Sequence, residues 1–131
     1  MTEFAWRIDN GQADRVHELF LEAGSISAPG MTLNSREEIA TTFGNRARDT
    51  SRVSRHLWSN PRYEILGQDR VSVTTVVQTF MGSLTDDEEL PVANGNFIVG
   101  DSIDVVQRDA DRRWLFESRQ LKVLFAPPKP A

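Results

Sequence analysis

The spacing of apolar residues predicts helices in the first third of the chain. Phe4 and Ile8 lie four residues apart, which is the spacing of one helix face, and a second run with helical spacing extends from about residue 13 to 22. Asn10-Gly11 separates the two runs. We therefore expect a short helix ending near Asp9, a kink over 9–11, a second helix over about 13–22, and a short strand over 25–28.

A further helix is expected after Ser35. Ser35 followed by Glu38 three residues later matches a capping box, in which the two side chains bond the free amides of the first helical turn. The predicted helix continues to about Arg48. Ile39 and Phe43 lie four residues apart and are expected to face the core.

After residue 51 the pattern changes to that of β-strands. Long runs rich in Val, Ile, Thr and aromatic residues predict strands over 53–66, 70–82, 97–108 and 113–125. Short turns fall between them at 67–69 and 109–111, and an acidic loop at 85–89. Helices followed by consecutive strands indicate an α+β fold with helices packed against one face of a curved antiparallel sheet.

The length of 131 residues bounds the chain to one domain. We assign 1–125 to that domain and 126–131 to a Pro-rich tail that cannot enter a helix or a sheet interior. The hydrophobic share of 39% and the charged share of 26% are ordinary for a soluble globular protein.

Charge and cysteine content narrow the classes of function. A net charge of -4 and a pI near 5.1 argue against a nucleic-acid partner or an anionic membrane surface. The lack of cysteine excludes disulfides, thiolate metal sites and a thiol nucleophile. No apolar run approaches the roughly 20 residues that span a bilayer, and no signal-peptide pattern is visible, so a cytoplasmic location is expected.

His56 and Asp9 are the main candidates for chemistry. A carboxylate that holds an imidazole fixes its tautomer and supports its charged form, which is the basis of proton transfer. His56 starts a strand in which Trp58 and Asn60 should share its face. The residues alone favour a structural role for His56, such as a bond to a backbone carbonyl or exposure at the sheet edge.

Asp9 needs a partner wherever the fold places it. It lies near a helix C-terminus, where the helix dipole disfavours a carboxylate by up to about 1 kcal/mol. The partner could be His56, but Arg7, Arg15 and the amides of the next helix are alternatives.

Other charged residues are interpreted as structural. Asp104 and Arg119 lie on strands joined by the last hairpin and are expected to form a salt bridge across the sheet. Arg46, Arg48, Arg52 and Arg55 are expected to form a charged surface near a loop rather than an anion site. The acidic loop lacks convergent ligand spacing, so no metal site is predicted.

Four segments resemble the SnoaL-like branch of the nuclear transport factor 2-like superfamily, and together they cover nearly the whole chain. They are Trp6-x-x-Asp9-x-Gly11-x-x-Asp14, Ser54-Arg55-His56-x-x-x-Asn60-Pro61, Gly100-x-x-x-Asp104, and Trp114-x-Phe116 followed by Arg119. The resemblance implies a cone: a strongly curved antiparallel sheet wrapped by helices around one apolar pocket. Relatives include scytalone dehydratase, steroid isomerases and polyketide cyclases, together with non-catalytic proteins.

The resemblance also assigns residues. Asp9 and His56 fall on the Asp–His pair that transfers protons in the dehydratases. The chain departs from scytalone dehydratase in three ways: Ile8 replaces a tyrosine, Ile103 replaces an asparagine, and the second pocket histidine has no counterpart. Gln78 or Asn60 could supply the missing polar group.

These observations predict a cofactor-independent lyase or isomerase that acts on a small apolar ring-containing carbonyl or hydroxy compound. His56 would be the general base and acid, and Asp9 would orient it. The expected pocket residues are Trp6, Phe20, Phe43, Trp58, Asn60, Gln78 and Phe80. The alternative is a non-catalytic protein that binds a hydrophobic small molecule or serves as an accessory subunit.

A second copy of the chain is the expected protein partner. The strands carry apolar residues on both faces, for example Val77 on one and Val76 on the other, so both faces of the sheet should be covered. We expect a homo-oligomer, with a dimer ahead of a trimer.

Overall fold

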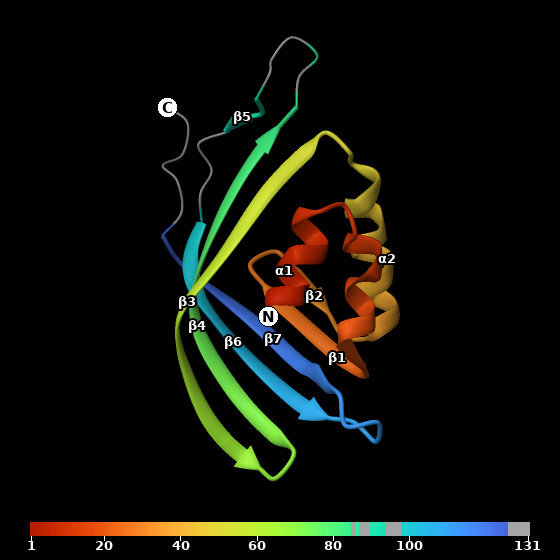
Figure 1. The fold of residues 1–131 in the computed structure, drawn as a ribbon, viewed down its shortest axis with the longest axis vertical. Helices are drawn as coiled ribbons and strands as arrows, with labels where there is room; N and C mark the ends of the chain where they lie inside the picture. Colours follow the sequence, from red (N-terminus) through yellow and green to blue (C-terminus); the bar gives the residue numbers. More distant parts are fainter. Residues whose placement is uncertain (85, 87–89, 94–97, 126–131) are drawn as a thin grey trace.

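A computed structural model describes residues 1–84, 86, 90–93 and 98–125. The described chain forms a long, curved sheet whose concave face is covered by the helices (Figure 1). The helices are α1 (Thr2–Asp9), the 3-10 helix η1 (Ala13–Leu19) and α2 (Arg36–Arg48). The strands are β1 (Phe20–Ala28), β2 (Met31–Leu33), β3 (Arg52–Gly67), β4 (Arg70–Ser83), β5 (Val92–Ala93), β6 (Ile98–Arg108) and β7 (Trp114–Phe125).

The strands are ordered β2-β1-β7-β6-β4-β3, and β5 pairs with β4 outside this order. The predicted α+β class and the curved sheet under N-terminal helices are confirmed. The predicted strand bounds agree with β3, β4, β6 and β7 to within a residue or two. Alternation and turn residues therefore located these strands correctly.

The start of α2 follows from its capping residues. The Ser35 side chain accepts a hydrogen bond from the Glu38 amide at 3.1 Å, as predicted. The Glu38 carboxylate accepts from the amide of Asn34 at 2.6 Å, one residue earlier than in a standard capping box. Ile39 is fully buried, as its position on the apolar face predicts.

The prediction of a second helix reaching residue 22 is wrong beyond Leu19. The helix is a short 3-10 turn, and the chain is extended from Phe20, which is completely buried and pairs with Phe116 of β7. The Arg36 guanidinium donates to the Phe20 carbonyl and fixes this transition. Tertiary packing therefore overrides the local helical spacing.

The predicted antiparallel pairing holds for the long strands β3, β4, β6 and β7, and the sheet as a whole is mixed. β1 pairs with β7 in parallel, while the other neighbours pair antiparallel. Parallel strands need a long crossover connection, and here most of the chain lies between them. Pro29-Gly30 forms the turn of a β1–β2 hairpin, with Gly30 at a φ of 75°.

The hydrophobic core lies where the helices meet β1 and β7. It comprises Phe4, Ile8, Ala13, Val16, Phe20, Ile26, Leu33, Ile39 and Phe116. Phe4 makes edge-to-face contacts with the rings of Phe20 and Phe116, at centroid distances of 6.2 Å and 6.1 Å. This aromatic packing attaches α1 to the sheet.

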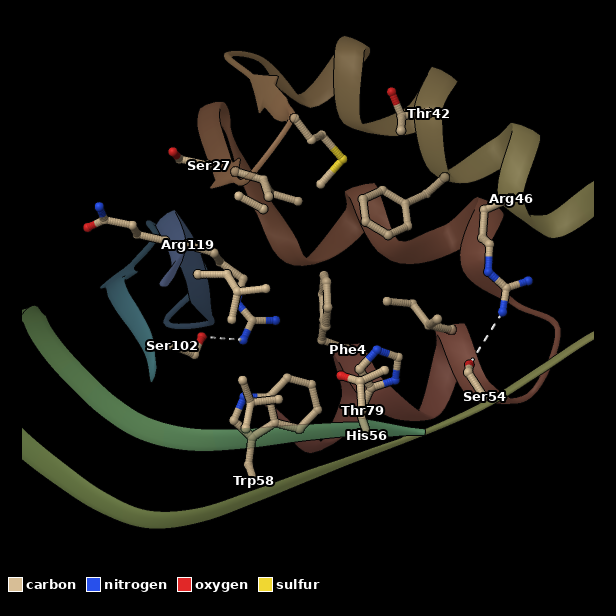
Figure 2. A pocket seen from close by; sticks show the side chains of 18 of the residues that line it. Phe4, Ser27, Thr42, Arg46, Ser54, His56, Trp58, Thr79, Ser102 and Arg119 are labelled. Atoms are coloured by element: carbon tan, nitrogen blue, oxygen red, sulfur yellow. Dashed lines mark hydrogen bonds between the residues drawn. The ribbon is translucent and has the colours of Figure 1, made fainter. Parts of the chain in front are cut away.

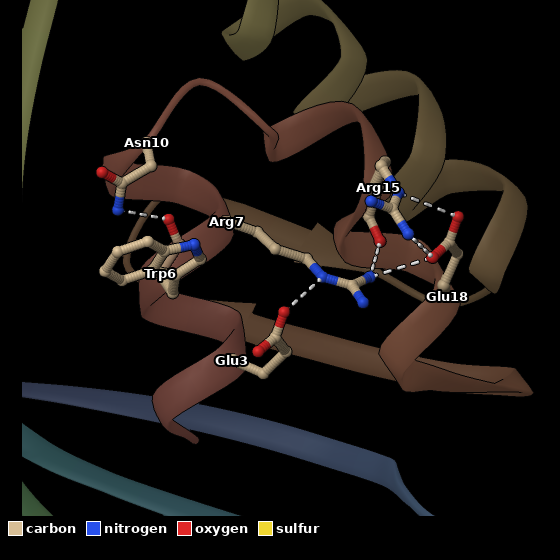
Figure 3. A network of polar contacts seen from close by, with 6 residues as sticks. All are labelled: Glu3, Trp6, Arg7, Asn10, Arg15 and Glu18. Carbon is tan, nitrogen blue, oxygen red and sulfur yellow. Dashed lines mark hydrogen bonds and ion pairs between the residues drawn. The ribbon is translucent and has the colours of Figure 1, made fainter.

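A polar network attaches α1 to η1 (Figure 3). The Arg7 guanidinium donates to Glu3 at 3.1 Å and to Glu18 at 3.0 Å, and also to the Arg15 carbonyl at 2.6 Å. At the end of α1, the Asn10 amide and side chain both donate to the Trp6 carbonyl. These bonds fix the last turn of α1, and with it the position of Asp9.

Some predicted segments lie outside the described residues: 85 and 87–89 of the acidic loop, Phe97 of the predicted third strand, and the Pro-rich tail 126–131. In the part of the chain that is described, no helix is long and apolar enough to cross a membrane.

Candidate active site

Asp9 and His56 lie in direct contact. His56 Nδ1 is 2.7 Å from Asp9 Oδ1, and the His56 backbone amide donates to Asp9 Oδ2 at 2.9 Å. Both side chains are largely withdrawn from solvent, with 6% of Asp9 and 18% of His56 exposed. Of the partners left open by the sequence, His56 is therefore the one that Asp9 takes, while Arg7 bonds Glu3 and Glu18 instead.

Neighbouring polar groups hold the Asp9 carboxylate in place. The Ser54 hydroxyl donates to Asp9 Oδ1 at 2.7 Å and in turn accepts from Arg46 at 3.3 Å. Arg55 donates to the backbone carbonyl of Asp9 at 3.1 Å. The carboxylate is thus positioned by β3 from several sides, which offsets its unfavourable place at the end of α1.

The surroundings of His56 favour its neutral form. Burial lowers the pKa of His56 below its ordinary value of 6.5, although the Asp9 carboxylate acts in the opposite direction. The positive charges of Arg119 and Arg46 add to the lowering. The imidazole stacks on Trp58, with ring centroids 5.5 Å apart and planes at 18°.

His56 lies in the wall of a cavity of about 310 Å³ between the helices and the concave face of the sheet (Figure 2). Most of the wall is apolar; its larger apolar side chains are Phe4, Ile8, Ile26, Met31, Phe43, Trp58, Val77 and Leu121. Thr79 and Ser102 contribute hydroxyls, and Arg119 a guanidinium. A mostly apolar cavity with a few polar groups is typical of a small-molecule site.

Arg119 forms the predicted salt bridge with Asp104, and it also reaches the cavity. Two parallel bonds of 2.8 Å and 3.0 Å join the pair, and Asp104 is completely buried. Nη1 of Arg119 has no hydrogen-bond partner among the described residues. The guanidinium lies over the Phe4 ring at 4.1 Å. Sequence reasoning missed this second role because strand pairing alone does not show which face of the sheet encloses a cavity.

Only some of the predicted pocket residues line this cavity. Phe43 and Trp58 do, whereas Phe20 is completely buried in the core. Trp6 is 58% exposed and borders a second groove of about 710 Å³. Phe4 and Ile8 line the first cavity, whereas Trp6 lies on another face of α1. The prediction for Trp6 was wrong because residues of one helix point in different directions.

The polar candidates Asn60 and Gln78, and with them Phe80, do not line the cavity. Phe80 and Gln78 alternate with the cavity residues Val77 and Thr79 along β4 and point to the opposite face of the sheet. Asn60 has a φ of 53° at a break in the β3–β4 register between residues 59 and 62, which ends the alternation that starts at His56.

The wall of the second groove includes both residues of the dyad, Asp9 and His56, together with Trp58. Its other walls come from the start of α1 and from β3, β4 and β6, including Trp6, Tyr63 and Val73. His56 is therefore bordered by open space on two sides. Within the described residues, no three His, Asp or Glu side chains converge in a way that could hold a metal ion.

A curved sheet with helices on its concave face and a cavity between them defines the class: an α+β protein of the nuclear transport factor 2-like, cystatin-like fold. Residues 1–120 match the model of the SnoaL-like domain, and the chain belongs to that family. A search of curated protein sequences gave no match.

Similar solved structures share the fold over almost the whole chain. A candidate scytalone dehydratase from Novosphingobium aromaticivorans is 20% identical with a TM-score of 0.78, and the match covers 100% of this chain and 83% of that one. The type 2 hexachlorocyclohexane dehydrochlorinase LinA is 15% identical with a TM-score of 0.77, covering 98% and 83%. ActVI-ORFA from Streptomyces coelicolor is 17% identical with a TM-score of 0.73, covering 94% and 90%.

Proposed function

We propose that this protein is a cofactor-independent lyase or isomerase that acts on a small ring-containing carbonyl or hydroxy compound. The observation that carries the proposal is the 2.7 Å contact between Asp9 and His56 in the wall of an apolar cavity. A base in the wall of an apolar cavity can remove a proton from carbon, because water is excluded there and does not occupy the lone pair of the base.

The contact with Asp9 defines which nitrogen of His56 reacts. A neutral imidazole carries its proton on Nδ1, where the carboxylate accepts it, so that Nε2 keeps its lone pair. The lowered pKa of His56 keeps the ring neutral at neutral pH, which is the form that a general base needs. Once Nε2 takes a proton, Asp9 stabilises the imidazolium that results.

The proposed reaction has two proton transfers. Nε2 of His56 removes a proton from the carbon next to a carbonyl group, and the electron pair forms an enolate with a negative oxygen. In a lyase this pair then forms a double bond to the adjacent carbon, whose hydroxyl takes the proton from Nε2 and departs as water. In an isomerase another carbon of the enolate takes the proton. Arg119 would stabilise the negative oxygen, since its Nη1 has no partner among the described residues.

The structural neighbours support the class of reaction. One is named for a dehydratase and another for a dehydrochlorinase, and both names describe elimination of a small group from carbon. Those activities belong to the neighbours, whose identity to this chain is 20% or less. They make a base-initiated elimination the first reaction to test here.

A non-catalytic binding protein is the second candidate. Ile8 lines the cavity, and by the resemblance it replaces a tyrosine of scytalone dehydratase. An isoleucine cannot donate to a carbonyl oxygen, so the cavity lacks one polarising group of that enzyme. A hydrophobic ligand held without chemistry would fit this difference.

An NMR titration of His56 in the wild type and in Asp9→Asn tests the coupling on which catalysis depends. We expect a wild-type pKa below 6.5 because burial disfavours the imidazolium. In Asp9→Asn the pKa of His56 should fall further, since the lost carboxylate charge is what raises it. His17 of η1, the other histidine of the chain, gives an internal reference in the same spectra.

The titration has a clear negative outcome. If the pKa of His56 is the same in the wild type and the variant, the two side chains are not coupled in solution and the dyad proposal fails. The binding-protein candidate would then be preferred.

We also predict that the protein assembles as a homo-oligomer. Large apolar side chains are exposed on β3 and on the outer face of β4: Leu57, Tyr63, Ile65, Leu66 and Phe80. β3 is the last strand in the described sheet order, so its outer edge is open to another chain. Light scattering coupled to size exclusion should give the mass of a dimer, or otherwise of a trimer; the mass of one chain would contradict the prediction.

A further inference from the structure

The charges around the cavity differ from those of the whole chain. The chain carries a net charge of -4, yet the described residues that line the cavity include Arg46, Arg52 and Arg119 and no carboxylate. Asp9 and Asp104 do not line the cavity themselves; each is bonded to a residue that does, Asp9 to His56 and Asp104 to Arg119. Within the described residues, the acidic side chains of the protein are thus absent from the cavity wall, and its arginines add positive charge to a mostly apolar surface.

The three arginines are not equivalent. Arg119 is paired with Asp104 by two short bonds. Among the described residues, the Arg46 side chain donates to the Ser54 hydroxyl alone, at 3.3 Å, and the Arg52 side chain hydrogen-bonds the sulfur of Met81 alone, at 3.2 Å. Within the described part of the chain, neither of these two forms an ion pair with a carboxylate.

Arg46 and Arg52 come from different elements, and they lie close enough for their charges to interact. Arg46 lies in the last turn of α2 and Arg52 begins β3, and both line the cavity beside Ser54. Figure 2 shows Arg46 extending from α2 toward Ser54. Burial lowers the pKa of Arg46 and the charge of Arg52 lowers it further, while the carboxylates of Asp49 and Asp9 act in the opposite direction. Two like charges in the wall of a cavity would be stabilised by an anion between them.

The rest of the cavity suits an apolar body. Phe43, Met31 and Leu121 line it together with Trp58, whose indole stacks on His56. We propose that the natural ligand is an amphipathic ring acid, with its ring against these apolar side chains and its carboxylate bound by Arg46 and Arg52. A guanidinium matches a carboxylate in charge and geometry.

The proposed carboxylate site differs from the sequence interpretation, which predicts that Arg46, Arg48, Arg52 and Arg55 form a charged surface near a loop rather than an anion site. Arg48 is exposed and donates to Asn45, and Arg55 donates to backbone carbonyls, so neither lines the cavity. Arg48 therefore provides a matched control with the same charge, two residues from Arg46 on α2.

The inference rests on the proposed function for the identity of the site, but its test requires only binding. Isothermal titration calorimetry would compare 2-naphthoate with 2-naphthamide, a neutral compound of nearly the same shape. The wild type should bind the acid about tenfold more tightly than the amide at low salt, as expected for one charge-assisted contact. Added salt should reduce the difference.

Three variants test which side chain causes the tighter binding of the acid. Arg52→Gln should remove most of the roughly tenfold preference for the acid, while Arg48→Gln should keep it. His56→Gln should also keep it, so loss of turnover in that variant is separable from loss of anion binding. Equal affinity for acid and amide in the wild type, no binding of the acid up to its solubility, or equal losses in Arg52→Gln and Arg48→Gln would each overturn the inference.

Discussion

Replacing His56 by glutamine is expected to lower kcat by about 10²–10⁴-fold, the usual contribution of a general base. Glutamine retains a polar side chain of similar length but cannot accept a proton from carbon. The readout is the change in ultraviolet absorbance when ring-containing hydroxy-ketones or enones gain or shift a double bond. Substrates that also carry a carboxylate should be included in the first screen.

The pH dependence of the same reaction gives a second readout. The base must be neutral, and burial lowers the pKa of His56 below 6.5, so kcat/KM should be flat at neutral pH and should fall on the acidic side of 6.5. This acidic limb should be absent from the residual activity of His56→Gln.

The control for this prediction is His17→Gln, which alters the other histidine without touching the cavity. It should turn over substrate like the wild type. If His56→Gln also turns over an identified substrate like the wild type, His56 is not the base. If the wild type turns over none of these compounds, and the wild type and His56→Gln bind a ligand equally well, the binding-protein candidate is favoured.

Replacing Asp104 by alanine is expected to destabilise the protein by about 3–5 kcal/mol, the range for a buried ion pair that loses one partner. Asp104 is completely buried and Arg119 is 6% exposed, so the remaining guanidinium charge would stay in the core without a counterion. The Ser102 hydroxyl, 3.1 Å from each carboxylate oxygen, would lose the acceptor to which it donates and keep the bond that it accepts from Arg119 at 3.3 Å. Denaturant unfolding monitored by tryptophan fluorescence measures the change in the free energy of unfolding.

Glu117→Ala is the matched control. Glu117 bonds Arg70 at 2.9 Å, and 36% of the Glu117 side chain and 47% of the Arg70 side chain are exposed, so its loss should cost at most about 1 kcal/mol. The double variant Asp104→Leu with Arg119→Met should recover much of the stability, because it removes both buried charges. Equal losses in Asp104→Ala and Glu117→Ala would show that burial of the Asp104–Arg119 pair is unimportant.

Much of the fold was predictable because its signals are local. The Ser35 cap, the turn residues and the alternation along the strands act within a few residues of where they occur. Phe20 shows the limit of such signals. Its helical spacing to Val16 predicted a helix, but pairing with Phe116, far along the chain, made it extended.

The sequence determined that Asp9 needs a partner and that His56 shares a face with Trp58, because a helix end and a strand impose these conditions locally. Only the tertiary structure decided that the partner of Asp9 is His56, 47 residues away, and that Arg46, Arg52 and Arg119 line the cavity. Because the β3–β4 register is broken near Asn60, this residue is not among those that line the cavity. Such contacts depend on the curvature of the sheet and on which helix covers it, and these are properties of the whole packed chain.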